Sequence, residues 1–172
     1  EDFQGVTKLI LPGVGAFDHA MSSFLNSGLS QTVQTKVIDQ KMPVIGICVG
    51  MQMLGNSSDE GALPGLGWIP GKVRKFDETL IKGYTRLPHM GWNDITVLST
   101  DTIFSGFPTN PLFYFLHSYY FESQNPQHNI ATAFYGLEYA SAIQRENIFG
   151  VQFHPEKSHE FGIKLLENFA KI

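Results

Sequence analysis

The feature that most constrains the fold is a cysteine set between two glycines at the end of a short apolar run. Residues 43–47 have the pattern of a buried strand, and they run into the pentapeptide GICVG at residues 46–50. The spacing glycine–x–nucleophile–x–glycine is typical of a sharp turn from a strand into a helix in α/β proteins. A helix beginning near Gly50 directs its first amides toward Cys48, which favours the thiolate. The motif therefore predicts a reactive sulfur at the edge of a sheet.

The alternative is that Cys48 is a buried core residue, as isolated cysteines usually are. The glycine spacing and the position between a strand and a helix favour the nucleophile. Cys48 is the single cysteine of the chain, so no intramolecular disulfide can form. A retained thiol is typical of a reducing compartment, and we expect a cytoplasmic protein.

The elements around this turn alternate between strand and helix. Apolar periodicity predicts strands at residues 6–11 and 43–47, and helices at residues 16–25, 30–40 and 50–54. This order indicates a parallel sheet covered by helices. Glycine and proline breakers in residues 56–67 predict a loop.

The second half of the chain has the pattern of an added antiparallel section. Strands are predicted at residues 72–76, 95–98, 112–121, 130–134, 141–145 and 148–153. Glu146-Asn147 lies between the last two strands and indicates a tight hairpin, and apolar residues between 161 and 169 indicate a closing amphipathic helix. We therefore expect one α/β domain over residues 1–172.

Composition excludes several classes of function. The net charge of −4 and the absence of a Lys/Arg cluster argue against a nucleic-acid-binding protein. The apolar runs are far too short to span a bilayer. Six histidines and one cysteine show no metal-ligand spacing, so neither a metal nor another cofactor is expected.

His154 is the best candidate for the proton-transfer group that a cysteine nucleophile needs. It follows the apolar run 148–153 and precedes Pro155 and Glu156. Proline holds the preceding residue out of the helical region, so the tripeptide is expected to be extended. Glu156 would then lie beside His154 and orient its ring, as the third member of a triad. The alternative is an ordinary surface turn.

The turn after the first strand is a candidate for stabilising negative charge on a tetrahedral intermediate. Two backbone amides usually hold such an oxyanion. The amide of Val49 is one candidate, and the amide of Val14 or of Gly15, in the segment PGVG at residues 12–15, is the other. The alternative is a plain strand-to-helix turn. A dinucleotide site is disfavoured because Asp18 stands where the third glycine of that fingerprint is required.

Five segments resemble one enzyme family. They are LILPGVGAFDHAM (9–21), PVIGICVGMQML (43–54), LPHMGWN (87–93), FYFLHSYYF (113–121) and FGVQFHPEKS (149–158). The chain resembles the class I, triad-type glutamine amidotransferases, and within them the glutaminase subunits of imidazole glycerol phosphate synthase. This resemblance implies a flavodoxin-like fold with a central, mostly parallel sheet flanked by helices.

The resemblance also implies roles for individual residues. Cys48, His154 and Glu156 match the catalytic triad. Positions that hold glutamine are matched by Gly13, Gly15, Gln52, Glu60, His117, Ser118 and Tyr119, and positions that face the partner are matched by Trp92, Asn93 and Lys157. The implied partner is a cyclase with a (β/α)8 barrel, which receives the ammonia in a heterodimer used for histidine biosynthesis. Such glutaminases are nearly silent until the partner binds its own ligand.

The resemblance leaves two alternatives open. Members of the family begin with a further β-α-β segment ahead of the strand at residues 6–11, so we expect a domain that is incomplete at its N-terminus. A chain of this kind could be a non-catalytic module that only docks on the cyclase. It could also be a different cysteine hydrolase on the same fold, such as a γ-glutamyl hydrolase.

Overall fold

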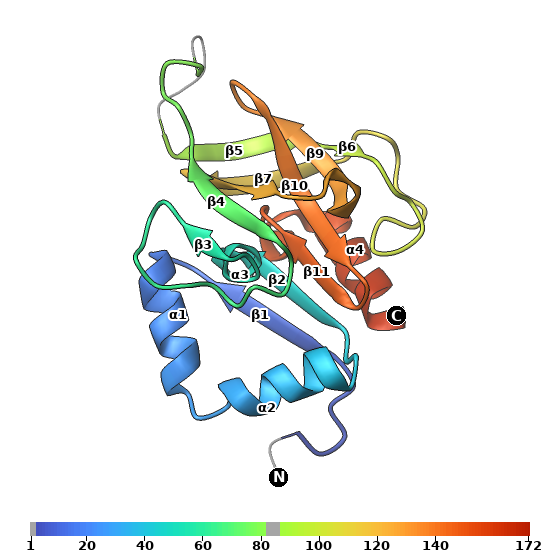
Figure 1. Ribbon diagram of the computed structural model, residues 1–172. Coiled ribbons are helices and arrows are strands. Elements are labelled where there is room, and N and C mark those ends of the chain that lie inside the picture. The colour runs from blue at the N-terminus through green and yellow to red at the C-terminus, as the bar shows by residue number, and fades with distance from the viewer. Residues whose placement is uncertain (1–2, 82–86) are drawn as a thin grey trace.

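The computed structural model describes residues 3–81 and 87–172 (Figure 1). The strands are β1 (Leu9–Gly13), β2 (Val44–Cys48), β3 (Ser57–Ser58), β4 (Gly71–Lys75), β5 (His89–Asp94), β6 (Thr96–Val97), β7 (Leu112–His117), β8 (Tyr119–Ser123), β9 (Asn129–Phe134), β10 (Glu138–Arg145) and β11 (Ile148–Val151). The helices are α1 (Phe17–Asn26), α2 (Ser30–Gln34), α3 (Val49–Met53) and α4 (His159–Lys171). A π-helical turn covers Thr35–Asp39, and 3-10 turns cover Pro126–His128 and Pro155–Lys157.

The main sheet is mixed. Within the described residues it has nine strands, in the order β1-β2-β11-β10-β8-β4-β3, with β9 paired to β10 and β6 to β9. β1, β2 and β11 run parallel to one another. All five residues of β2 are buried, as expected for a strand with neighbours on both edges and cover on both faces.

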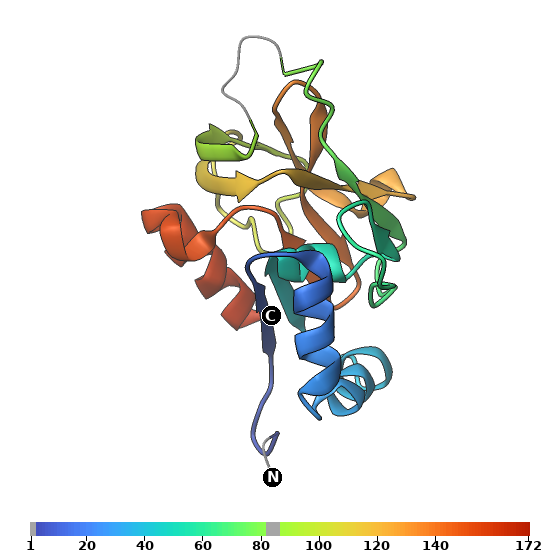
Figure 2. The ribbon, with the colours of Figure 1, turned by 90° about the vertical axis from the view of Figure 1, so that its left-hand side faces the viewer.

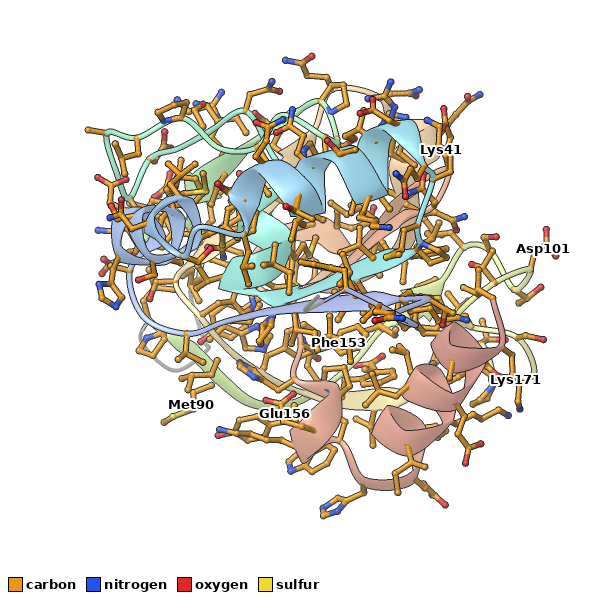
Figure 3. All side chains as sticks on the ribbon, turned by 90° about the horizontal axis from the view of Figure 1, so that it is seen from below. Lys41, Met90, Asp101, Phe153, Glu156 and Lys171 are labelled. Carbon is orange, nitrogen blue, oxygen red and sulfur yellow. The ribbon has the colours of Figure 1, made fainter. Side chains whose placement is uncertain are left out.

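Helices cover both faces of the parallel section. Figures 2 and 3 show α4 on one side of β1 and β2, and α1 and α2 on the other. Phe169 of α4 is buried against Phe149 of β11, with ring centroids 5.9 Å apart. Val37 belongs to a second buried cluster, with Val44 of β2. No helix in residues 3–81 and 87–172 is long and apolar enough to cross a membrane.

The antiparallel section branches at β10. Ala140 pairs with Phe121 of β8 and with Thr132 of β9, so these two strands lie on opposite edges of β10. β11 follows β10 through the hairpin at Glu146-Asn147, as the sequence predicted. β5 and β7 form a separate two-stranded sheet beyond this branch (Figure 1).

Several sequence predictions need correction. The helix expected at residues 30–40 is divided into α2 and the π-helical turn. The strand expected at residues 112–121 breaks at Ser118, so that β7 belongs to the small sheet and β8 to the large one. The last strand ends at Val151 rather than at 153, and β5 was not predicted. The fold is α/β as expected. The antiparallel part of its main sheet is larger than the expected mostly parallel sheet implies.

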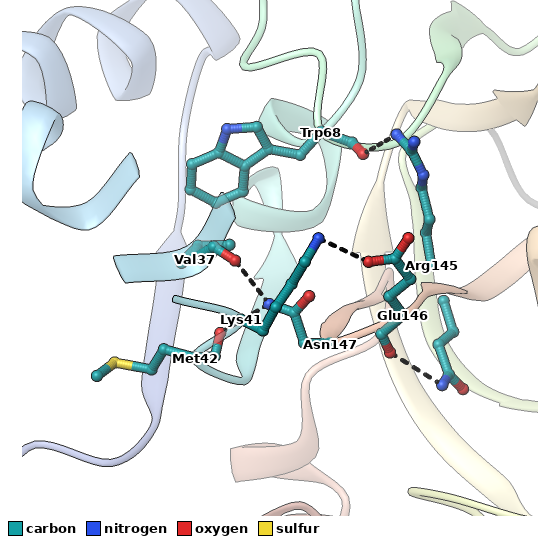
Figure 4. Close-up of polar contacts among 8 residues, drawn as sticks. Val37, Lys41, Met42, Trp68, Arg145, Glu146 and Asn147 are labelled. Carbon is teal, nitrogen blue, oxygen red and sulfur yellow. Dashed lines mark hydrogen bonds and ion pairs between the residues drawn. The ribbon is translucent and has the colours of Figure 1, made fainter. Parts of the chain in front are cut away.

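One side chain ties the β10–β11 hairpin to the segment that precedes β2 (Figure 4). The Asn147 amide nitrogen donates to the carbonyls of Val37 and Met42, each at 2.9 Å. Nearby, Lys41 and Glu146 form an ion pair at 2.7 Å, and both side chains are 60% exposed.

These two contacts predict unequal effects on stability. Asn147→Ala removes a donor from two carbonyls and should lower the free energy of unfolding by about 1–3 kcal/mol. Lys41→Ala removes an exposed ion pair and should change it by less than about 1 kcal/mol. Urea denaturation of both variants measures the difference. Equal losses of unfolding free energy in the two variants would contradict the prediction.

Candidate active site

Cys48 lies on a strained turn between β2 and α3. Its φ of 55° and ψ of −114° place a non-glycine residue in a region that L-residues rarely adopt. The flanking glycines are required by close backbone packing. A Cβ on Gly46 would lie 2.5 Å from the Gly50 carbonyl oxygen, and one on Gly50 would overlap the carbonyl oxygen of Leu11. The predicted strand-to-helix elbow is therefore confirmed.

Burial dominates the chemistry of the sulfur. Cys48 is only 4% exposed, and burial raises the pKa of its thiol to about 11. The carboxylates of Glu156 and Glu60 add to this rise, while the Val49 amide and Lys157 oppose it. The expected help from the helix amide is present, but it is outweighed, so the prediction of a favoured thiolate is wrong for this state of the protein.

Two further contacts hold the sulfur. Cys48 Sγ lies 3.8 Å from the Leu116 carbonyl oxygen, which can accept the thiol proton. The side-chain amide nitrogen of Gln152 lies 3.7 Å from the same sulfur and can donate to it. Gln152 is fully buried and also accepts a hydrogen bond from Gln52 at 3.0 Å. The sulfur therefore has a donor and an acceptor within reach, which suits both the thiol and the thiolate.

His154 is oriented by Glu156 as predicted. Its Nδ1 lies 2.7 Å from the Glu156 carboxylate, so Nδ1 carries the proton and Nε2 is the basic atom. Nε2 is buried and has no hydrogen-bond partner among the described residues. Cys48 and His154 line the same cavity, which leaves Nε2 available for a proton from the sulfur or a ligand.

The backbone around His154 is held by β7. The His154 amide donates to the Tyr114 carbonyl at 2.8 Å. The buried Ser158 hydroxyl donates to the His154 carbonyl at 2.6 Å and accepts from the Tyr114 amide at 3.0 Å. His154 is extended, as its position before proline predicts, but Pro155 starts a 3-10 turn. The turn, and not an extended tripeptide, brings Glu156 back to the ring.

The cavity in front of Cys48 has a volume of about 210 Å³ and gathers most of the predicted residues. Its wall consists of Val14, Gly15, Cys48, Val49, Gln52, Glu60, Leu116, His117, Ser118, Tyr119, His154 and Lys157. Gly13 is not part of the wall. A Cβ at Gly13 would lie 2.6 Å from the Gly50 nitrogen, so this glycine permits the close approach of β1 to the elbow.

Hydrogen bonds to Glu60 and Asp18 connect the polar side of the cavity to α1. The Glu60 carboxylate accepts from the Phe17 amide at 2.8 Å, at the start of α1. Asp18 accepts from the amides of Ala62 and Leu63, which joins the same helix to the loop that carries Glu60. Glu60 remains exposed at the cavity mouth, where its carboxylate can accept hydrogen bonds from a ligand ammonium group.

The residues predicted to face a partner are divided between two places. Trp92 and Asn93 lie on β5 and do not line the cavity, whereas Lys157 does. Trp92 is 48% exposed and stacks on His159 with ring centroids 5.2 Å apart. Lys157 Nζ lies 5.6 Å from the centre of the Tyr114 ring, which meets Trp92 edge-on. Trp92 and Lys157 thus contact the same ring beside the cavity.

Sequence reasoning missed Gln152, Ser158 and Leu116. Gln152 is a polar residue inside an apolar run, two positions before His154, and this signal could have identified it. The Ser158 hydroxyl binds two backbone groups and Leu116 acts through its own carbonyl, and no residue pattern reports either contact.

The raised thiol pKa predicts the reactivity of the isolated chain. Because the thiolate is the nucleophile, the rate of Cys48 alkylation by iodoacetamide should rise continuously from about pH 7 to about pH 10. At neutral pH the thiolate fraction is on the order of 10⁻⁴ for a thiol pKa of about 11. Mass spectrometry of the alkylated peptide measures the rate, with a small free thiol as the control. A plateau below about pH 8 would contradict the prediction.

Known proteins share both the sequence and the fold. The family model for "Glutamine amidotransferase class-I" matches residues 3–172. "Imidazole glycerol phosphate synthase subunit HisH" of Bdellovibrio bacteriovorus is 54% identical over 173 residues, covering 100% of this chain and 84% of the relative. The protein of the same name from Leptospira interrogans is 45% identical over 172 residues, with coverage of 100% and 84%.

Solved structures agree on the fold. A Thermoplasma acidophilum protein described as a putative GMP synthase subunit has a TM-score of 0.69 at 21% identity, covering 99% of this chain and 74% of that one. A second structure, described as a glutamine amidotransferase, has a TM-score of 0.70 at 19% identity, with coverage of 97% and 81%. Together with the family match, the sequence relatives and the geometry around Cys48, these likenesses show that the chain belongs to the class I glutamine amidotransferase family.

Proposed function

We propose that this chain is the glutaminase subunit of imidazole glycerol phosphate synthase. It hydrolyses glutamine to glutamate and ammonia and passes the ammonia to a cyclase partner in histidine biosynthesis. The observation that carries the proposal is Cys48 on its elbow, sharing a cavity with a His154 ring that Glu156 orients. The relatives named as HisH subunits support the choice of synthase.

The proposed reaction uses the atoms of this cavity in two stages. The Cys48 proton moves to His154 Nε2, and the sulfur attacks the carboxamide carbon of glutamine. Negative charge on the carboxamide oxygen is held by the Val49 amide and by an amide of Val14 or Gly15. His154 then gives its proton to the departing nitrogen, which leaves as ammonia. A γ-glutamyl thioester remains on Cys48.

The second stage regenerates the enzyme. Water replaces the ammonia, and His154 Nε2 takes one of its protons as the oxygen attacks the thioester carbon. The carbon–sulfur bond breaks, glutamate leaves, and the proton returns from His154 to the Cys48 sulfur. Glu156 keeps Nδ1 protonated throughout, so that Nε2 is the atom that exchanges protons.

The cavity also contains suitable groups for the α-substituents of glutamine. The exposed Glu60 carboxylate accepts the ammonium group, and the backbone of residues 117–119 faces the α-carboxylate. Gly15 has a φ of 86°, which allows close backbone approach without a side chain, and Gln52 completes this end of the wall.

The protonated thiol fits a subunit that depends on a partner. A cyclase with a (β/α)8 barrel would bind over Trp92, Asn93 and Lys157 to form a heterodimer in the cytoplasm, with residues 1–172 belonging to one domain. Lys157 lines the cavity and favours the Cys48 thiolate, so movement of this lysine on binding would change the reactivity of the sulfur. This connection supports a low basal activity that rises in the complex.

Substitutions of the triad test the proposal. Cys48→Ala should reduce ammonia release by about 10³-fold or more, and His154→Asn should do the same, because the two groups act as a unit. Glu156→Gln should cause a smaller loss, since it leaves both reacting atoms in place. Ammonia release from glutamine is measured with the cyclase and its ligand present, and Lys41→Ala serves as a distant control. Undiminished release by Cys48→Ala would reject the mechanism.

A chloroketone analogue of glutamine separates the catalytic proposal from the two alternatives. A glutaminase site is alkylated at Cys48 by this reagent, and glutamine protects against it. A module that only docks on the cyclase would not react, and a γ-glutamyl hydrolase would cleave γ-glutamyl peptides while ignoring glutamine.

A further inference from the structure

One wall of the cavity, at residues 116–119, is a sharp corner in the chain. β7 ends at His117 in the small sheet, and β8 begins at Tyr119 in the large sheet, with a bend at Ser118 between them. Residues 116–119 all line the cavity. The conformation of this corner therefore determines where its backbone amides and carbonyls lie relative to a ligand in the cavity.

The His117 side chain closes the corner. Its Nδ1 lies 2.7 Å from the Tyr119 carbonyl oxygen, two residues along the chain. A carbonyl can only accept, so Nδ1 carries a proton and donates it. The Gln52 amide nitrogen donates to the same oxygen at 3.3 Å. Burial lowers the pKa of His117 to about 3, so the ring is neutral and its Nε2 must accept a hydrogen bond.

Two buried groups face that nitrogen. Tyr139 Oη lies 3.3 Å and His89 Nδ1 lies 3.2 Å from His117 Nε2, and these two atoms are 3.2 Å from each other. The His89 ring is held between Phe115 and Tyr135, with ring centroids 4.9 Å and 4.0 Å away. Burial lowers the pKa of His89 to about 4, so this ring is neutral as well.

One arrangement of hydrogens satisfies the whole group. The Asn93 amide carries two hydrogens, and its nitrogen lies 3.0 Å from the Phe134 carbonyl and 3.5 Å from His89 Nε2. His89 Nδ1 is then the donor in its contacts with the Tyr139 hydroxyl and His117 Nε2, the Tyr139 hydroxyl can also donate to His117 Nε2, and His117 donates from Nδ1 to the Tyr119 carbonyl. Each ring nitrogen has one defined role, and the series runs from β5 to the cavity wall.

We infer that His117, His89 and Tyr139 are positioning residues for glutamine, which set the backbone corner at residues 117–119 through the Nδ1 donor of His117. This inference rests on the proposed function, because it gives these buried residues a role in binding the same substrate. They do not touch the reacting atoms. They change the fraction of protein molecules in which this corner has the conformation that binds glutamine. Their substitution therefore changes KM.

Two substitutions at His117 form a matched pair. In His117→Asn the side-chain nitrogen occupies the place of Nδ1 and keeps a donor for the Tyr119 carbonyl. In His117→Gln the amide reaches the place of Nε2, and the Nδ1 donor is lost. We expect His117→Gln to raise KM for glutamine about 5-fold or more over the wild type, and His117→Asn, which loses only the Nε2 acceptor, to raise it by a smaller factor.

Tyr139→Phe provides an independent test if the His117 variants do not fold. It removes one buried hydroxyl and keeps the ring, so KM should rise by about 2- to 10-fold while kcat changes little. All variants are assayed for glutamate release in the complex with the cyclase and its ligand. An unchanged KM in Tyr139→Phe, or equal defects in His117→Asn and His117→Gln, would overturn the inference.

Cys48 alkylation separates positioning from general damage to the structure. His117→Gln should react more slowly than the wild type with the chloroketone analogue of glutamine, and at the wild-type rate with iodoacetamide. Equal losses with both reagents would overturn the positioning role. Failure of the wild type itself to react with the glutamine analogue, in the complex with the cyclase and its ligand, would reject the proposed function. If the wild type reacts normally and His117→Gln shows no selective loss of reaction with the glutamine analogue, the inference is rejected and the proposed function is not.

Discussion

The structure depends on the contact between the backbones of β1, β2 and α3 at the elbow. Gly50 lies so close to Leu11 that a Cβ would overlap its carbonyl oxygen, and Gly46 and Gly13 are equally closed to side chains. This contact fixes where α3 starts and forces Cys48 into its unusual backbone conformation. It also places the turn at residues 12–15 beside the nucleophile. The position of the sulfur therefore follows from packing that the two flanking glycines make possible.

The same packing that positions the sulfur also favours its protonated form. Burial of Cys48 raises its pKa to about 11, and the favourable amide of Val49 does not compensate. His154 Nε2 has no partner among the described residues, although its Nδ1 is firmly held by Glu156. The site thus combines a His154–Glu156 pair and a protonated Cys48 that line one cavity. Burial is the largest cause of the raised thiol pKa, and Lys157, which lines the cavity, opposes it.

Sequence reasoning succeeded where a local pattern determines the structure. The glycines around Cys48 and the proline after His154 act on their own neighbours, so the elbow and the extended backbone of His154 could be predicted, whereas Glu156 reaches the ring through a 3-10 turn that was not predicted. The break at Ser118 could not, because residues 112–121 have one continuous strand-like pattern and the choice of sheet depends on partners distant in sequence. The prediction that the thiolate of Cys48 is favoured failed for a related reason, because the burial that raises the thiol pKa is a property of the whole fold. Gly13 was assigned to substrate on motif alone, whereas the structure gives it a packing role.

The central claim is that Cys48 forms a covalent γ-glutamyl intermediate. The direct measurement is to mix the chain and its cyclase partner with radiolabelled glutamine, quench in acid, and digest the protein. The label should appear as a thioester on the peptide that contains Cys48, and it should disappear when unlabelled glutamine is added before the quench. Ammonia release without any label on that peptide would contradict the account, as would label attached to another residue.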